Sequence, residues 1–335
     1  MLNRNAEALF WIGRYMERAE NHARLIDVHY HLHAEDELGL PVSSGLDDEP
    51  LISLGKWMRI VDALGSKDAY EQQYGTYREA DVLHYMTLDR HNPNSLISCI
   101  CHARSNLRSL REKVPCELWE TVNAFYLWLK EKQPEDLMRE SPHLFYSRVK
   151  EWTAIFLGFS QSIMPRENEW HFIECGRYLE RAENTLRIMK AVNHAANDEG
   201  WCSAAAYPYL HAVLKSVSGS QPFRRYYADV MSVESIIEFV ILNTAFPRSV
   251  HYALQALDDH MRQIELQDKQ LRAAHDRIIR QLVKVNADLA CLELEDLFTD
   301  HLNGSESVVD HLLNVCQQLG ETFARTFFRM GEATA

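Results

Sequence analysis

One string of nine residues occurs twice in this chain with a single substitution: GRYMERAEN begins at Gly13 and GRYLERAEN begins at Gly176. The copies are 163 residues apart, close to half of the 335-residue length. A repeat with this period predicts two copies of one helical unit packed about a pseudo-two-fold axis. Packing alone can be satisfied by many apolar residues, whereas most of these repeated residues are charged or polar. The repeat therefore indicates a specific polar arrangement.

Helical periodicity dominates the chain, and no stretch shows sustained alternation with period two. We predict an all-α, internally duplicated helical bundle with pseudo-two-fold related halves. The first helical repeat spans residues 1–163 and the second spans 164–335, packed together as one compact unit. The expected helices cover residues 5–36, 51–65, 76–89, 94–113, 116–133, 142–163, 167–195, 203–217, 232–245, 248–290 with a break, and 305–331; the expected loops cover 39–50 and 216–222.

A second, weaker correspondence joins the segment that begins at residue 82 to the segment that begins at residue 236. Each predicts an apolar helix, a short turn that ends in Pro93 or Pro247, and a new helix with proline at its first position. Only the first copy keeps Asp89 and Asn92.

The turn at Asp89 and Asn92 is a secondary candidate site, because free amides at the start of the following helix can hold an anion. The alternative is that Asn92 is simply the N-cap of that helix.

On a helix, the repeated string forms an apolar stripe, in which residues recur at spacings of three and four. The stripe comprises Ile12, Met16, Ala19, Ala23 and Ile26, and in the second copy Cys175, Leu179, Ala182, Leu186 and Met189. Charged and amide side chains lie beside it, and two arginines upstream could extend their network. These network candidates are Arg14, Glu17, Arg18, Glu20, Asn21 and Arg24, the matching Arg177, Glu180, Arg181, Glu183, Asn184 and Arg187, and the upstream Arg4 and Arg166.

Three interpretations of these candidates are open. They could form solvated pairs on helix surfaces, worth a few tenths of a kcal/mol each. They could instead form a half-buried network cross-paired between the two helices, in which loss of one partner costs roughly 3 to 5 kcal/mol. In the third, Arg14, Arg24, Arg177 or Arg187 binds a carboxylate of a small molecule or peptide.

Composition disfavours several classes of partner. The formal net charge of −13 argues against nucleic acid or anionic lipid as the main ligand. No apolar run is long enough for a membrane span, and charged residues interrupt the first 30 positions. We therefore predict a cytoplasmic protein without a membrane segment.

The chemistry of known metal and nucleophile sites is weakly represented. The seven cysteines form no C-x-x-C pair. His29 and His33 lie four residues apart on one predicted helix, but the second copy has no matching histidines. We expect neither a metal nor a cofactor.

Several segments resemble the bacterial alpha-E domain family: MLNRNAEALFWIGRYMERAENHARLIDV, NPNSLISCICHARSNLRSLRE, WETVN and MPRENEWHFIECGRYLERAEN. The resemblance spans essentially the whole chain. It implies an all-α fold and a genomic association with circularly permuted ATP-grasp ligases and transglutaminase-like proteins. It supplies no catalytic residue.

From this resemblance we expect an accessory or interaction subunit of an ATP-dependent peptide or amide ligation system. The partner would be an ATP-grasp ligase or a transglutaminase-like protein, with an anionic small molecule or peptide as a possible ligand. The alternative is an enzyme in its own right, in which Glu17 or Glu180 acts as acid or base on a carboxylate- or amide-containing substrate.

Overall fold

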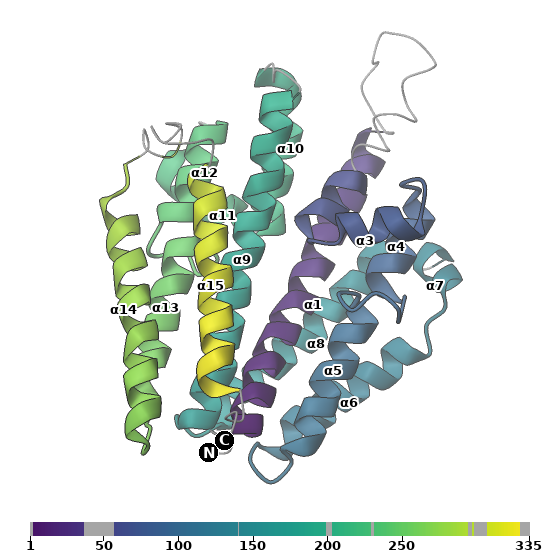
Figure 1. Ribbon diagram of the computed structural model, residues 1–335. Helices are drawn as coiled ribbons and strands as arrows, with labels where there is room; N and C mark the ends of the chain where they lie inside the picture. Colours follow the sequence, from purple (N-terminus) through teal and green to yellow (C-terminus); the bar gives the residue numbers. More distant parts are fainter. Residues whose placement is uncertain are drawn as a thin grey trace.

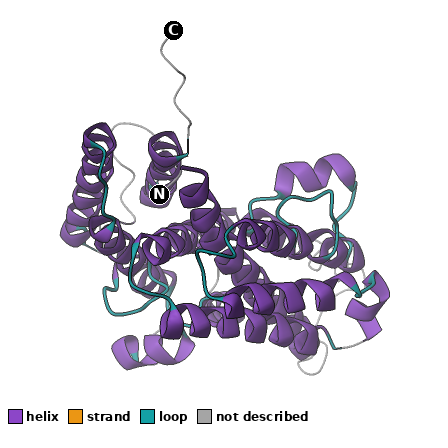
Figure 2. Cartoon of the chain, turned by 90° about the horizontal axis from the view of Figure 1, so that it is seen from below, coloured by secondary structure: helices purple, strands orange, loops and turns teal. Residues whose placement is uncertain are grey.

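The computed structural model describes residues 3–36, 57–139, 141–198, 203–228, 231–293, 297 and 307–328. These residues form helices joined by turns, and no strand occurs among them (Figures 1 and 2). The predicted all-α fold class is confirmed. A short helical stretch covers residues 57–63, and the other helices are α1 (Asn3–Asp36), α3 (Lys67–Gln73), α4 (Glu79–Thr87), α5 (Leu96–Ser109), α6 (Cys116–Lys130), α7 (Pro134–Arg139), α8 (Pro142–Ile163), α9 (Asn168–Asp198), α10 (Ser203–Ser216), α11 (Ser220–Tyr227), α12 (Val233–Leu242), α13 (Val250–Gln263), α14 (Lys269–Cys291) and α15 (Val308–Phe327).

The differences from the expected helices concern short elements. Helices α3, α7 and α11 were not expected, because they are too short to show a helical period. The predicted loop at 216–222 is wrong in part, since α11 begins at Ser220 and buries Phe223 against Phe239. The predicted break within 248–290 is found between α13 and α14. The predicted loop at 39–50 lies outside the described residues.

Helices α1 and α9 form the centre of the molecule and pack against each other, and they diverge toward their C-terminal ends (Figure 1). Helices α5 and α8 pack on α1, and α6 packs on both of them. In the same way, α13 and α15 pack on α9, and α14 packs on both. In Figure 1 the helices α3 to α8 therefore lie on one side of the central pair, and α11 to α15 lie on the other.

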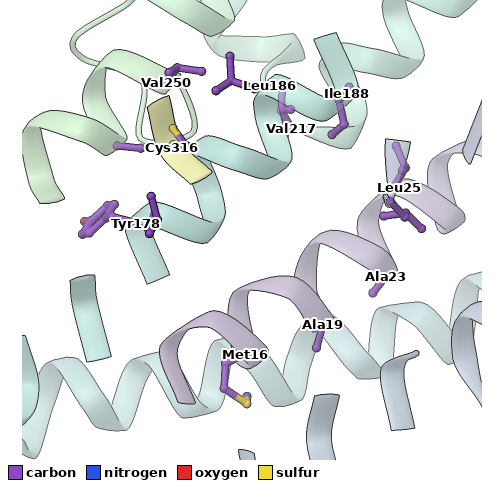
Figure 3. Packing of buried hydrophobic residues seen from close by; sticks show 14 of the residues in the cluster. Met16, Ala19, Ala23, Leu25, Tyr178, Leu186, Ile188, Val217, Val250 and Cys316 are labelled. Atoms are coloured by element: carbon purple, nitrogen blue, oxygen red, sulfur yellow. The ribbon is translucent and has the colours of Figure 1, made fainter. Parts of the chain in front are cut away.

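The apolar stripes predicted from the repeated string are buried in the core. All ten of their side chains are at most 4% exposed. Figure 3 shows Met16, Ala19 and Ala23 along one side of α1. Burial of these stripes supplies the hydrophobic free energy that holds both long helices in the interior.

Gly13 and Gly176 mark the place where α1 and α9 approach most closely. A Cβ atom added to Gly13 would overlap the backbone carbonyl oxygen of Ile173, and one added to Gly176 would overlap that of Phe10. Because Phe10 and Ile173 are also 163 residues apart, the two contacts are reciprocal. Only glycine allows two helix backbones to approach this closely.

Helices α5, α6 and α8 are thus arranged around α1 as α13, α14 and α15 are arranged around α9. The internal duplication itself and the division between residues 163 and 164 stay predictions.

Replacing Gly176 by alanine tests the close approach of the helices. Alanine favours an isolated helix, so intrinsic propensity alone predicts a gain of about 0.5 to 1 kcal/mol. The overlap with Phe10 predicts instead a loss of about 3 kcal/mol or more in the free energy of unfolding, measured by chemical denaturation.

Gly158 is the matched control, since it lies inside α8 with no atom within 4 Å of an added Cβ. The variant Gly158→Ala is expected to show the propensity gain. Equal effects of both substitutions would contradict the close approach.

Candidate functional site

Two crossed ion pairs join α1 to α9 one turn beyond the glycines. Arg181 donates from Nε to Oε1 of Glu17 and from Nη2 to Oε2 of Glu17, both at 2.7 Å. Arg18 donates from Nε to Oε1 of Glu180 at 2.7 Å and from Nη2 to its Oε2 at 3.0 Å. Each pair is therefore a bidentate guanidinium–carboxylate pair, which is the strongest common geometry for these groups.

The spacing within the repeated string explains why these residues meet. Glu17 and Glu180 each follow a crossing glycine by four residues, so they lie on the helix face that meets the other helix. Their side chains are 2% and 0% exposed. Such pairs differ from solvated surface pairs, because their partners lie on different helices and water is excluded.

Further arginines surround the pair that contains Glu180. Arg14 binds Oε2 of Glu180 at 2.6 Å and Oε2 of Glu183 at 2.7 Å. Arg187 binds Glu183 at 2.9 Å and donates to Oδ1 of Asn184 at 3.2 Å. The carboxylates on this side each accept from at least two guanidinium groups.

The pair that contains Glu17 is surrounded in a related way, but by a different arginine. Arg248 binds Glu17 at 3.2 Å and Glu20 at 2.5 Å, and Arg24 binds Glu20 at 2.7 Å. Arg177, the counterpart of Arg14, turns instead to Glu174 on its own helix. We call the following residues the ion-pair network: Arg14, Arg18, Arg24, Arg177, Arg181, Arg187 and Arg248, with Glu17, Glu20, Glu174, Glu180 and Glu183.

Sequence reasoning missed Glu174 and Arg248. Trp11 occupies the position in the first copy that corresponds to Glu174, so the repeat gave no signal for a carboxylate there. Arg248 directly follows Pro247 in the second matched segment, where the first copy has Asn94. This difference between the two matched segments is a sequence signal for a role of Arg248.

The upstream arginines behave differently from the expectation. Arg166 does not join the network: its guanidinium lies 3.9 Å from the centre of the Trp170 ring and donates to the carbonyl oxygens of Ser160 and Gln161. These carbonyls belong to the last turn of α8, where a cation interacts favourably with the helix dipole. Arg4 lies in α1, and its side chain is outside the described part of the chain.

Asn21 and Asn184 are buried next to the network. Within the described residues, the Nδ2 group of each has no hydrogen-bond partner, although Asn184 accepts from Arg187 through its oxygen. The two asparagines occupy equivalent positions in the repeated string, so each copy contains the same unsatisfied donor.

Asp89 and Asn92 build a turn and do not contact the network. Oδ1 of Asp89 accepts from the backbone of His91 at 2.8 Å. Asn92 donates to the carbonyl of Tyr85 and accepts from the backbone of Asn94, both at 2.9 Å.

The N-cap expected at Asn92 is wrong. Ser95 caps α5, just as Ser249 caps α13, and Pro93 and Pro247 each lie two residues before the cap. In both copies the serine hydroxyl accepts a hydrogen bond from the third backbone amide of the helix. The helix therefore begins directly after this serine, and proline does not occupy its first position.

The arginines keep the buried glutamates ionised. Burial alone would raise the pKa of Glu17, but Arg181 and Arg248 more than reverse this effect and lower it to about 2. Burial likewise opposes ionisation of Glu180, and Arg18 and Arg14 hold its pKa well below the usual range.

Positive charge exceeds negative charge by two in the network, and the ends of two helices face the surplus. Arg24 donates to the hydroxyl of Ser218 at 2.6 Å, just beyond the end of α10. Arg187 lies next to Gly65, just beyond the helical stretch 57–63. Helix C-termini carry partial negative charge, so these positions are favourable for the two arginines.

A small cavity of about 20 Å³ lies between α1, α8 and α9. Glu17, Glu20, Glu174 and Arg177 line it together with apolar side chains. Oε1 of Glu174 has no hydrogen-bond partner among the residues that the structure describes. A cavity of this size holds about one water molecule, which could satisfy that oxygen.

The sequence model of one protein family matches residues 1–328, and its description is a predicted alpha-helical domain with a conserved ER motif. The Glu-Arg dipeptide occurs twice in this chain, at residues 17–18 and 180–181, and these four residues form the crossed pairs. The chain belongs to the Alpha-E family. In this Alpha-E chain, each copy of the dipeptide supplies a carboxylate and a guanidinium to the other copy.

The curated relatives of this Alpha-E chain are uncharacterized proteins of mycobacteria. A protein of Mycobacterium bovis is 25% identical over 313 residues, which cover 86% of this chain and 34% of the relative. A protein of Mycobacterium tuberculosis strain H37Rv is 24% identical over the same length. The chain thus spans about a third of the length of these relatives. No solved structure matches it.

Helices long and apolar enough to cross a membrane are absent from the described part of the chain.

The variant Glu180→Gln tests the burial of the crossed pairs. It removes the charge that Arg14 and Arg18 share, so we expect the free energy of unfolding to fall by roughly 3 to 5 kcal/mol. Glu151→Gln is the control, because Glu151 forms an exposed pair with Arg148 on α8 and should change stability by less than about 0.5 kcal/mol. A loss no larger than that of the control would show that the Glu180 pair is effectively solvated.

Acid titration tests the ionisation of Glu17. Its pKa is about 2 in the folded chain against an ordinary value of 4.5, so its stabilising effect is complete above pH 4.5 and disappears as the pH falls toward 2. This carboxyl alone should contribute about 3 kcal/mol to the loss. Unfolding free energies measured between pH 6 and pH 2.5 should depend less on pH in Glu17→Gln than in the wild type. Parallel curves would contradict the assignment.

Proposed function

We propose that this Alpha-E chain is a helical interaction module, an accessory subunit of an ATP-dependent peptide or amide ligation system in the cytoplasm. The resemblance to the family suggests the system, with an ATP-grasp ligase or a transglutaminase-like protein as the partner. The ion-pair network is then structural: it fixes how α1 and α9 cross and so shapes the outer helices that meet the partner.

The main observation in support of this proposal is that the arginines and glutamates of the network pair with one another. Its carboxylates are already held by guanidinium groups of the same chain, and most of those groups are largely buried. An arginine that oriented a substrate carboxylate would have to give up a buried internal partner first, at a cost of several kcal/mol.

The lengths of the relatives add independent support. The matched segment makes up 34% of the mycobacterial proteins, so in them a unit like this one is joined to further chain. A helical unit that is linked to other chain in relatives is well suited to bind a separate protein here.

The alternative, catalysis by Glu17 or Glu180, has less support from the geometry. A general acid or base works best with a pKa near the operating pH, whereas the pKa of Glu17 is about 2. The adjoining cavity holds about one water molecule, which is too little room for a peptide or a small carboxylate substrate.

Co-expression with an ATP-grasp ligase and with a transglutaminase-like protein, the partners that the family resemblance implies, tests the proposal. We expect a stable complex with one of them in size-exclusion chromatography and no complex with an unrelated ATP-binding protein. Glu17→Gln, assayed well below its melting temperature, should keep the partner because Glu17 is buried. Failure to bind either well-expressed partner would refute an accessory role, and turnover by the isolated chain that is lost in Glu17→Gln would favour the enzyme.

A further inference from the structure

A second cavity has a volume of about 220 Å³. Its described lining residues lie between His84 and Pro134, and none of them belongs to the ion-pair network. It opens where the end of α4, the start of α5 and the end of α6 meet. Its polar lining consists of His84, Arg90, Lys130, Lys132 and Gln133, and the remaining lining is apolar.

The charge of this lining has one sign. Among the described residues, three basic side chains line the cavity and no carboxylate does. Arg90 and Lys130 form no ion pair within the part of the chain that the structure describes. Lys132 has partners of its own: it lies 5.4 Å from the centre of the Trp128 ring and takes part in a further contact. The neighbouring carboxylate of Asp136 is bound by the backbone of Gln133. The cavity therefore concentrates positive potential on a chain whose net charge is −13.

The turn that contains Asp89 and Asn92 positions Arg90. The backbone of His91 is held by Asp89, and Asn92 is tied to the end of α4 through Tyr85. Gln73 also donates to Asp89, at 3.1 Å. These bonds on both sides of Arg90 fix its backbone at the edge of the cavity.

The helical architecture does not require this charge. In the matched segment of the second half, Glu238 stands where the first half has His84, and Thr244 stands where it has Arg90. A fold that is stable with a glutamate and a threonine there has no structural need for two basic residues.

We propose that this cavity binds a compact oxyanion with at least two negative charges, either a phosphate group or a pair of neighbouring carboxylates. Arg90 offers a planar fork that matches either group, while Lys130 supplies a point charge. The volume admits several water molecules and thus an anion of this size. The proposal does not depend on the ligation partner, because a chain that fails to bind that partner can still bind the anion.

The test is titration calorimetry of the full chain with inorganic phosphate and with glutarate, at constant ionic strength and with acetate as the monoanion. Saturable binding of one of the two dianions is expected, with acetate weaker by at least about tenfold. The two dianions distinguish a phosphate site from a dicarboxylate site. If neither dianion binds saturably, the proposal is wrong.

The double variant Arg90→Ala/Lys130→Ala should weaken dianion binding by at least about tenfold, since it removes two charge-assisted partners. Lys130→Met, which keeps the aliphatic stem, should weaken it in the same direction. The control Arg108→Ala/Lys113→Ala removes the same charge outside the cavity. Ile97 is the residue of α5 that lines the cavity, and Arg108 lies about 16 Å from it along the helix.

The control should change affinity by less than about twofold. Lysines beside a helix C-terminus also stabilise the helix, so melting temperatures are measured for every variant. A purely structural role would lower the melting temperature and leave dianion affinity unchanged. That result, or equal weakening in the control, would overturn the proposal.

Discussion

A carboxylate taken out of water must find positive charge close by, and this requirement organises the centre of the molecule. Glu180 is completely buried, and its charge is tolerable only because Arg14 and Arg18 come from the other helix. Glu17 depends in the same way on Arg181 and Arg248. Neither long helix can bury its motif without the other, so the pairing of α1 with α9 is built into the motif itself.

Close backbone approach and ion pairing support each other in this arrangement. The glycines at the crossing bring the helices together, and the glutamates one turn later then lie within direct reach of the opposite arginines. A wider crossing would leave water between them and replace bidentate pairs by weaker, screened ones.

The sequence predicted the long helices, the buried stripes and the residues of the central motif, because each has a clear period or an almost identical repeat. It did not predict that Arg177 would turn to Glu174, since one substitution at the position of Trp11 redirects a flexible side chain. Arg248 escaped notice because it lies on a turn brought close by tertiary packing. The cap at Ser95 was missed because proline and asparagine together made an earlier helix start plausible, although a serine hydroxyl two residues later gives a better cap. Short helices such as α3 and α7 carry too few residues for a period to show.

The most direct measurement of the central claim is a double-mutant cycle on one crossed pair, using Glu17→Gln, Arg181→Gln and the combined variant. The free energy of unfolding is determined for all four proteins by chemical denaturation at neutral pH. If the pair is buried and direct, the coupling energy is about 2 kcal/mol or more, and the double variant is less destabilised than the sum of the single variants. Additivity within about 0.5 kcal/mol would mean that Glu17 and Arg181 do not depend on each other, and the account given for the centre of this fold would be wrong.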